Sequence, residues 1–302
     1  MRRIWLAELA LTALACSASA QEPPQVSRSP QVSRWNLAGI SSPMWESHPA
    51  IDPLTGDLWF VRSDRHFAGW RILMARCSQG QWSEPQPMPI AGKGLEADPW
   101  FSADGRTVWF ISTRATGAMS GSALDIWRAQ RDAKGAWSAP ERLPAPVNSD
   151  AAEWFPRPAP DGWLYFGSRR TGGFGNDDIW RARQGPDGSW QVENAGPEFN
   201  TAAGEYEFQP SADGRWGVLA TDKGLYRFVA SPTGWRRAEK FGPQINVNGT
   251  EIGPMITPDG RGFIYSRDTG HEMSGEFFVV ELDSSKHAAS LSECHGKNSI
   301  KE

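Results

Sequence analysis

The chain is poor in the residues and motifs from which many catalytic and nucleic-acid-binding sites are built. Its 302 residues include 3 cysteines, 5 histidines and 4 tyrosines. Lysine and arginine form no long run, and the formal net charge is −4, which argues against nucleic acid as a partner. The absence of a Gly-x-Ser-x-Gly motif excludes the nucleophile elbow of α/β-hydrolases. No apolar run is long enough to span a bilayer, so we expect no membrane span.

The first twenty residues differ in composition from the rest of the chain. Two arginines precede an apolar run over residues 4–15, and Ala18-Ser19-Ala20 offers a small-residue cleavage site. This pattern predicts a secretory signal peptide over residues 1–20 and a periplasmic or secreted mature protein. Cys16 leaves lipoprotein anchoring as an alternative.

Tryptophan, by contrast, is abundant, and it marks an internal repeat. Five of the 16 tryptophans recur at steps of 47, 55, 53 and 45 residues, and a glutamate follows each of them before the next unit begins. A strand-rich repeat of this length is typical of propeller blades. The tryptophans are Trp35, Trp82, Trp137, Trp190 and Trp235, and the glutamates, called here the repeat glutamates, are Glu46, Glu96, Glu153, Glu205 and Glu251.

Each unit reads as four short strands, and the repeated tryptophan lies in the fourth, outermost strand, as in Ala136-Trp137-Ser138. In the second unit, residues 96–102 and 107–112 flank an Asp-Gly turn, in which glycine supplies a positive φ. The fifth unit has no closing tryptophan, and the missing strand is found at the start of the chain, over residues 32–40. We therefore predict an all-β, five-bladed propeller of four-stranded antiparallel blades over residues 32–282. The N-terminal strand completes blade five, and a polar tail follows over residues 283–302.

These motifs resemble the WD40-like repeat of TolB-type periplasmic propellers. The matching features are the Glu-x-x-Pro starts, the Asp-Gly turns, the aromatic second strands and the Asp-Ile-Trp third strands, as in Asp125-Ile126-Trp127 and Asp178-Ile179-Trp180. The resemblance implies a fold and a periplasmic setting. It does not carry TolB's lipoprotein binding to this chain, because the N-terminal α/β domain of TolB is missing and five blades are counted here instead of six.

The candidate binding residues lie on the predicted upper face, which carries the links between blades and the loops between second and third strands. The repeat glutamates open the innermost strands there, and arginines begin the facing loops. One hypothesis is an acidic channel mouth that binds a cation or a basic peptide. The alternative is structural, with each glutamate held by backbone donors or an arginine. The further candidates are Arg65, Arg114, Arg170, Trp45 and Trp154. The two tryptophans either pack between blades or stack on a ligand.

Histidine offers only weak metal candidates. His48 lies in the first strand of blade one, and His66 and His271 lie in upper loops of blades one and five. Imidazole and carboxylate groups are suitable metal ligands, but these residues form no tight spacing motif. We therefore predict neither a metal nor another cofactor.

Two cysteines remain after the predicted cleavage. Cys77 follows the third strand of blade one, and Cys294 follows the third strand of blade five by about a dozen residues, on the same lower face of adjacent blades. An even number of cysteines in an exported chain favours a disulfide, and the alternative is two unrelated thiols.

Three functions remain open. The first is a non-enzymatic binding or scaffold propeller of the cell envelope that engages a protein or peptide, or a glycan, through its upper face. The second is a carbohydrate-active enzyme, a glycosidase or lyase, with channel carboxylates as acid and base. The repeat argues against it, because catalysis needs unlike environments and the repeat glutamates look alike. The third is a metal-dependent lyase that uses the histidines of blades one and five.

Overall fold

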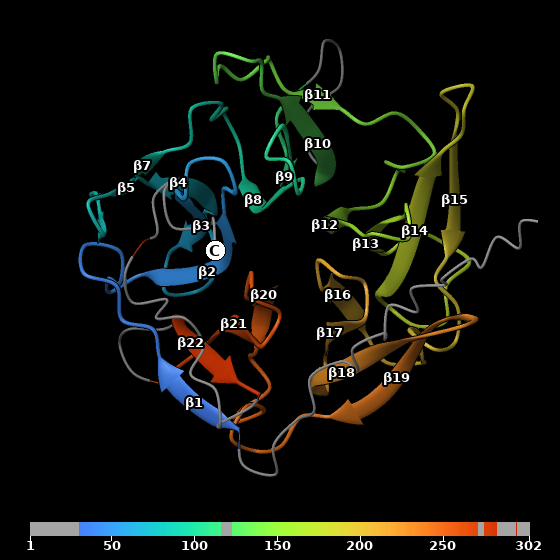
Figure 1. Ribbon diagram of the computed structural model, residues 1–302. Helices are drawn as coiled ribbons and strands as arrows, with labels where there is room; N and C mark the ends of the chain where they lie inside the picture. The colour runs from blue at the N-terminus through green and yellow to red at the C-terminus, as the bar shows by residue number, and fades with distance from the viewer. Residues whose placement is uncertain (1–29, 116–122, 271–274, 283–293, 295–302) are drawn as a thin grey trace, which may run out of the picture.

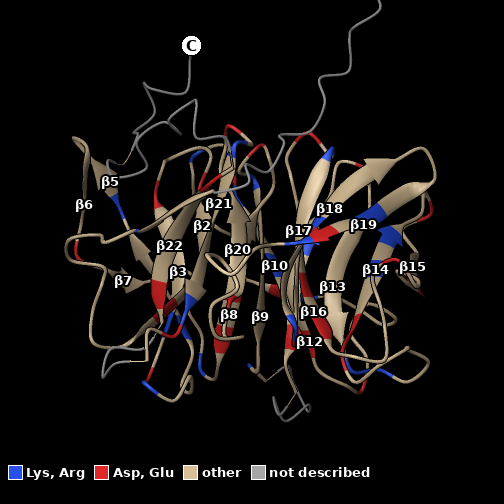
Figure 2. Cartoon of the chain, turned by 90° about the horizontal axis from the view of Figure 1, so that it is seen from below, with Lys and Arg blue, Asp and Glu red and all other residues tan. Residues whose placement is uncertain are grey.

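The computed structural model describes residues 30–115, 123–270, 275–282 and 294, and all regular structure in these ranges is β-strand. Five four-stranded sheets stand as blades around a common axis, and the region between their innermost strands is called here the channel (Figure 1). This confirms the predicted five-bladed, all-β fold. The upper face, with the inter-blade links, points down in Figure 2, and the hairpins between first and second strands lie on the opposite, lower face. The described segments include no helix that could cross a membrane.

Within each blade the strands follow one another antiparallel from the channel to the rim. Blade one comprises β2 (Trp45–Ile51), β3 (Leu58–Ser63), β4 (Arg71–Ala75) and β7 (Gln86–Pro87). Blade two comprises β8 (Glu96–Phe101), β9 (Thr107–Ser112), β10 (Asp125–Gln130) and β11 (Glu141–Arg142). Blade three comprises β12 (Glu153–Pro158), β13 (Leu164–Ser168), β14 (Asp178–Gln184) and β15 (Trp190–Asn194).

Blade four comprises β16 (Glu205–Pro210), β17 (Trp216–Thr221), β18 (Gly224–Ser231) and β19 (Gly234–Lys240). Blade five comprises β20 (Ile252–Ile256), β21 (Gly262–Arg267), β22 (Glu276–Glu281) and β1 (Gln31–Arg34). A separate hairpin, β5 (Cys77–Ser78) and β6 (Gln81–Trp82), stands beside blade one. Because the innermost strands of neighbouring blades contact one another around the ring, they form the wall of the channel.

The N-terminal strand closes the ring as predicted, but it is shorter than residues 32–40. β1 pairs antiparallel with β22, from Gln31 opposite Glu281 to Arg34 opposite Phe278. Beyond Trp35 the chain leaves the sheet and turns at Gly39, whose φ of 79° favours glycine. The pairing removes two sheet edges that would otherwise be open to other chains.

The repeated tryptophans do not all occupy outermost strands. Trp190 and Trp235 lie in β15 and β19, as expected, whereas Trp82 belongs to the β5–β6 hairpin and Trp137 makes only an isolated bridge to Arg131. Prolines explain why the expected outer strands do not form around Trp82 and Trp137. Proline has no N–H to donate to a neighbouring strand, so it is found mainly in short edge strands. Prolines stand next to or within both two-residue strands that replace the expected ones, β7 and β11.

The core lies between neighbouring blades, where aromatic side chains of facing sheets interlock. Between blades one and two, the Trp59 ring meets Phe101 edge-on with centroids 5.1 Å apart and also contacts Trp137 at 5.9 Å. Trp59 and Val108 are fully buried. This inter-blade burial is the main source of stability in the fold, since apolar area removed from water drives folding. It also holds the innermost strands rigidly around the channel.

Cys77 and Cys294 form a disulfide, with their Cα atoms 5.5 Å apart. This confirms the pairing predicted from the sequence. Cys77 begins the β5–β6 hairpin, and its amide donates to Asp57 of blade one. The bond therefore ties residue 294 to the β5–β6 hairpin beside blade one.

Reduction of this disulfide should destabilise the protein without dissolving the propeller. A crosslink over 217 residues restricts the unfolded chain, and native disulfides typically contribute about 2–4 kcal/mol. We expect the double substitution of Cys77 and Cys294 by serine to lower the free energy of unfolding by that amount, measured by denaturant titration with and without reductant. The double variant should be insensitive to reductant. Two free thiols in the oxidised, denatured wild-type protein would contradict the bond.

Candidate functional site

The repeat glutamates are committed to contacts within their own links and blades. All five are at most 1% exposed. Glu46, Glu153 and Glu205 each accept hydrogen bonds from the hydroxyl and the amide of a serine or threonine four residues earlier. Glu96 accepts from the amide of Gly92, and Glu251 accepts from three successive link amides. The carboxylates therefore fasten each link to the blade that follows it.

Arginines complete these contacts in four blades. Arg170 pairs with Glu153 at 2.9 Å and Arg114 pairs with Glu96, whereas Arg237 reaches Glu205 at 3.5 Å. In blade one the partner of Glu46 is Arg62 from β3, at 2.7 Å, and Arg65 lies exposed in the following loop. Burial raises the pKa of Glu46, and hydrogen bonds from Ser42 and Arg62 oppose this rise. Because these carboxylates are buried and paired, they offer a ligand almost no surface.

The residues that reach the channel stand two positions after the repeat glutamates, and they differ from blade to blade. In blades one, two, three and five the innermost strand carries a bulge at this position, which interrupts its pairing with the second strand. In blade four the irregularity falls one residue earlier, and Glu207 pairs with Ala220. Four of the five backbones adopt a positive φ two positions after the glutamate, between 50° and 62°, which is unusual for residues other than glycine and often marks functional sites. The five residues are His48, Asp98, Phe155, Glu207 and Gly253.

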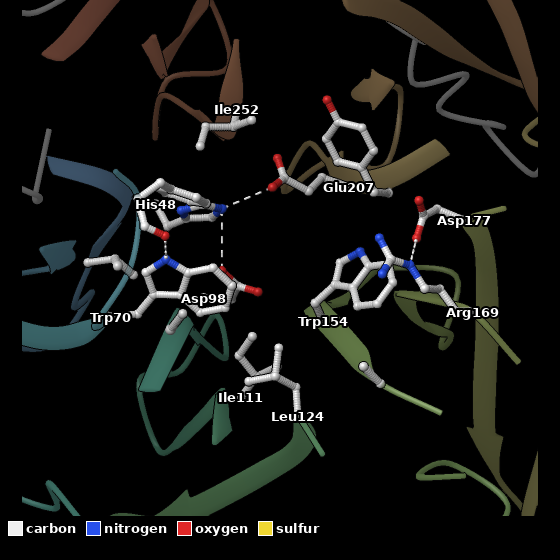
Figure 3. A pocket seen from close by; sticks show the side chains of 15 residues that line it. His48, Trp70, Asp98, Ile111, Leu124, Trp154, Arg169, Asp177, Glu207 and Ile252 are labelled. Carbon is white, nitrogen blue, oxygen red and sulfur yellow. Dashed lines mark hydrogen bonds and ion pairs between the residues drawn. The ribbon is translucent and has the colours of Figure 1, made fainter. Parts of the chain in front are cut away.

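Three of these residues, from blades one, two and four, meet in the channel and are called here the channel cluster. His48 Nε2 lies 2.9 Å from Glu207 Oε1 and 3.3 Å from Asp98 Oδ1 (Figure 3). Because a carboxylate only accepts hydrogen bonds, Nε2 is the donor. His48 Nδ1 lies 2.8 Å from its second partner, the hydroxyl of Ser47. All three side chains of the cluster are buried.

Backbone amides of the next blade hold both carboxylates of the channel cluster. Asp98 Oδ2 accepts from the amide of Phe155 at 2.8 Å, and Glu207 Oε2 accepts from the amide of Gly253 at 2.7 Å. Gly253 leaves no room for a side chain, because an added Cβ would lie 2.7 Å from the backbone nitrogen of His48. The cluster is therefore fixed by the ring itself, since each carboxylate bridges two blades.

The pKa values of His48 and Asp98 are both raised in the folded protein. Burial lowers the pKa of His48, but the charges of Asp98 and Glu207 outweigh burial, so that the pKa lies above its ordinary value. Burial raises the pKa of Asp98, and the charge of Glu207 adds to this rise. The imidazole of His48 and the carboxyl group of Asp98 therefore both have pKa values above their ordinary values.

The channel cluster forms part of the wall of a cavity of about 390 Å³, called here the upper pocket, which opens toward the upper face. Phe67, Trp70, Trp154 and Tyr206 line it with aromatic rings, and Val61, Ala97, Ile111, Leu124 and Ile252 supply aliphatic surface. Arg169 Nε donates to Asp177 Oδ1 at 2.7 Å on the side across from His48 (Figure 3). Convergent titratable groups inside an apolar pocket of this size are typical of small-molecule sites.

The sequence-based candidates are distributed unevenly around this pocket. Trp154 and His48 line it, whereas Trp45 is buried and packs against the Phe67 ring at 5.0 Å. Among the described residues, no three His, Cys, Asp or Glu side chains are arranged to hold a metal ion. His66 is exposed in the loop after β3, and His271 lies outside the described residues.

Asp98 and Glu207 were missed by reasoning from the sequence, which pointed to the repeat glutamates instead. The available signal was the position at which the repeat stops repeating. Two residues after each constant glutamate, the five units carry five different residue types. Similar residues at every unit usually maintain the blades, whereas unlike residues at one repeat position can assemble a site.

The channel cluster predicts a pH dependence of stability. Because the pKa of His48 is raised in the folded protein, its contribution to stability is fully present below pH 6.5 and is lost as the pH rises through the folded value. We expect the free energy of unfolding of wild type to exceed that of His48→Gln most clearly near pH 6 and the difference to narrow toward pH 9. Denaturant titrations across this range test the sign, and a difference that widens with pH would contradict it.

Comparison with known proteins supports the fold and goes no further. No family model and no curated protein sequence matches the chain. A family 117 glycoside hydrolase from the marine bacterium Zobellia galactanivorans is similar in structure, with a TM-score of 0.55 at 14% identity over 86% of this chain and 92% of that one. A gluconolactonase from Xanthomonas campestris gives a TM-score of 0.49 at 11% identity, covering 87% and 95% of the two chains. A putative TolB from Agrobacterium tumefaciens gives 0.37 at 17% identity, covering 66% and 82%.

Proposed function

We propose that this propeller is a carbohydrate-active enzyme that hydrolyses a glycoside in the upper pocket. The observation that carries the proposal is the convergence of Asp98 and Glu207 on His48 Nε2, at 3.3 and 2.9 Å, at the wall of an aromatic-lined cavity. Glycoside hydrolysis needs a proton donor for the leaving oxygen and a carboxylate that activates water or attacks the anomeric carbon. The objection drawn from the repeat glutamates does not apply to these residues, because their three environments are unlike.

We infer a role for each member of the channel cluster. The His48 imidazolium donates its Nε2 proton to the leaving oxygen as the glycosidic bond breaks, and the Glu207 carboxylate takes a proton from the water that adds to the anomeric carbon. Acid and base stand about 5–10 Å apart in working glycosidases, so the entering substrate must displace the Glu207 carboxylate, which lies 2.9 Å from Nε2 in the free protein. The glycosidic oxygen then takes the place of that carboxylate at Nε2. Asp98 stabilises the imidazolium and keeps the ring in position.

The pocket walls favour a sugar over a flexible peptide. Aromatic rings offer flat apolar faces on which the C–H face of a sugar ring can stack, and Trp70 and Trp154 stand on different sides of the cavity (Figure 3). The glycoside hydrolase with which the chain shares its fold adds support of a weaker kind, because one fold hosts many functions. The disulfide agrees with the proposed export to an oxidising compartment.

A panel of aryl glycosides and natural glycans, assayed for product release and for binding, tests the proposal. We expect turnover of at least one member, its loss in His48→Gln, and its retention in His66→Gln, which removes an exposed histidine of the same blade. Turnover that His48→Gln leaves unchanged, or the absence of both binding and turnover across the panel, would reject the proposal.

A second proposal retains the upper face as a protein- or peptide-binding surface of the cell envelope. Two exposed apolar side chains support it, Phe174 in the loop between β13 and β14 and Val247 in the link before β20, at 52% and 54% exposure. Shortening of the loop over residues 171–176 should abolish capture of an envelope partner, whereas His48→Gln should not. Equal capture by wild type and the shortened loop would count against this proposal.

A further inference from the structure

We propose that Arg157 is a positioning residue, a buried counter-charge that holds Asp98 in place and sets the protonation of the channel cluster from below. The inference deepens the proposed function, and it rests on that function only for its effect on turnover. Its structural part can be tested without any substrate.

Arg157 is the one charged residue at its position in the repeat. It stands four residues after Glu153, where the other blades carry Ala50, Trp100, Gln209 and Met255. Its side chain has no exposed surface, although arginine is almost never fully buried without a charged partner. None of the salt bridges within the described residues involves Arg157. A packing role alone does not explain a permanent charge at this depth.

The contacts of Arg157 are neutral groups from three blades. Nε donates to Gln209 Oε1 at 2.8 Å, and Nη1 donates to the carbonyls of Pro156 at 2.9 Å and Asp98 at 3.3 Å. The guanidinium also lies 3.6 Å from the ring centroid of Phe155 and 4.6 Å from that of Trp100. Since none of these partners cancels its charge by direct contact, that charge acts on the cluster through the protein interior.

Arg157 and Phe155, from the same strand β12, hold Asp98 at two points. Arg157 binds the main-chain carbonyl of Asp98, and the amide of Phe155 binds its carboxylate. Asp98 has a φ of 57°, a conformation that its neighbours must maintain. These two hydrogen bonds therefore fix the orientation of the Asp98 carboxylate toward His48.

Arg157 is the one positive charge, apart from the imidazolium itself, among the charged groups of the described residues that face His48. The charged groups that face His48 are Asp98 from β8, Arg157 from β12 and Glu207 from β16, while β20 contributes the backbone of Gly253 at this level. With His48 neutral the group carries a net charge of −1, and with the imidazolium it carries none. Arg157 thus opposes the two carboxylates and lowers the pKa of both His48 and Asp98. Burial in turn lowers the pKa of Arg157 to about 9.

The test is the titration of His48 followed by NMR of its ring protons, assigned by their loss in His48→Gln. We expect Arg157→Met to raise the midpoint by about one pH unit, the scale of removing one nearby charge. Arg131→Met is the matched control, because Arg131 is also buried, stacks on the Trp137 ring at 4.1 Å and pairs with Asp52 outside the cluster. It should destabilise the protein and leave the His48 midpoint unchanged.

A milder variant keeps the inference testable if Arg157→Met does not fold. Gln209→Glu has the same shape and places a negative charge at Arg157 Nε, so it should also raise the His48 midpoint. Where a glycoside substrate is found, the alkaline limb of the pH–rate profile should move upward by the same amount in each variant. A His48 midpoint equal to that of wild type in every folded variant would overturn the inference, whether or not the protein turns over a glycoside.

Discussion

Replacement of Glu207 by glutamine should reduce turnover about a thousand-fold, within the range that general acid–base groups contribute. Glutamine has the same shape, but its amide cannot take a proton from water. Its NH2 group would also face either the Gly253 amide or His48 Nε2, both of which are donors. The measurement is kcat on the glycoside that the panel identifies, with a denaturant titration to establish that the variant is folded.

Glu205→Gln provides the matched control two residues earlier on the same strand. Glu205 is as deeply buried, but it contacts Thr201 and Arg237 and does not line the upper pocket. We expect this variant to lose stability while its kcat remains within a few-fold of wild type. Equal kcat values for the two variants would show that the channel cluster has no privileged role.

Replacement of Arg170 by methionine should lower the free energy of unfolding by about 3–5 kcal/mol, the effect of leaving a buried ionic partner uncompensated. Arg170 donates to Glu153 and to the carbonyls of Pro146 and Val147, and it lies over the Phe166 and Trp180 rings. Without it, the fully buried Glu153 carboxylate retains only neutral donors. Loss of this size would remove a large part of the stability of an ordinary domain.

Arg128→Met is the control for this prediction. Arg128 pairs with Glu141, whose side chain is 57% exposed, on the outer strands of blade two. An exposed pair contributes little, because water solvates both charges, so we expect a loss below about 1 kcal/mol. Similar losses for Arg128→Met and Arg170→Met, compared by denaturant titration, would contradict a structural role for the repeat glutamates.

The architecture could be predicted from the sequence because each of its signals is local and recurs. The Asp-Gly turns, the aromatic strands and the constant glutamates repeat at the blade period, and the unpaired strand near residue 32 has one possible place in the ring. The disulfide followed from that layout. The predicted positions of the outermost strands in blades one and two were wrong, because prolines such as Pro87 interrupt the hydrogen bonding between strands.

The site was harder to predict because its residues lie where the regular alternation of side chains between the two faces of a strand is interrupted. In a regular strand, residue spacing tells which side chains share a face. The bulges and the positive φ values at His48 and Asp98 break this rule and select the residues that face the channel. Nothing in the sequence of one unit shows which residue of another blade it will meet. The contact between His48 and Glu207, 159 residues apart, exists only once the ring is complete.

The pairing of β1 with β22 also has a consequence for biosynthesis. Gln31 cannot pair with Glu281 until residue 281 has been synthesised and has emerged from the ribosome. Blades one to four can each assemble from one continuous segment, but the fifth sheet combines β20–β22 with β1 from the other end of the described chain. Such distant pairing slows folding. A nascent chain stalled before residue 281 would therefore carry two unsatisfied sheet edges and depend on chaperones to avoid association with its neighbours.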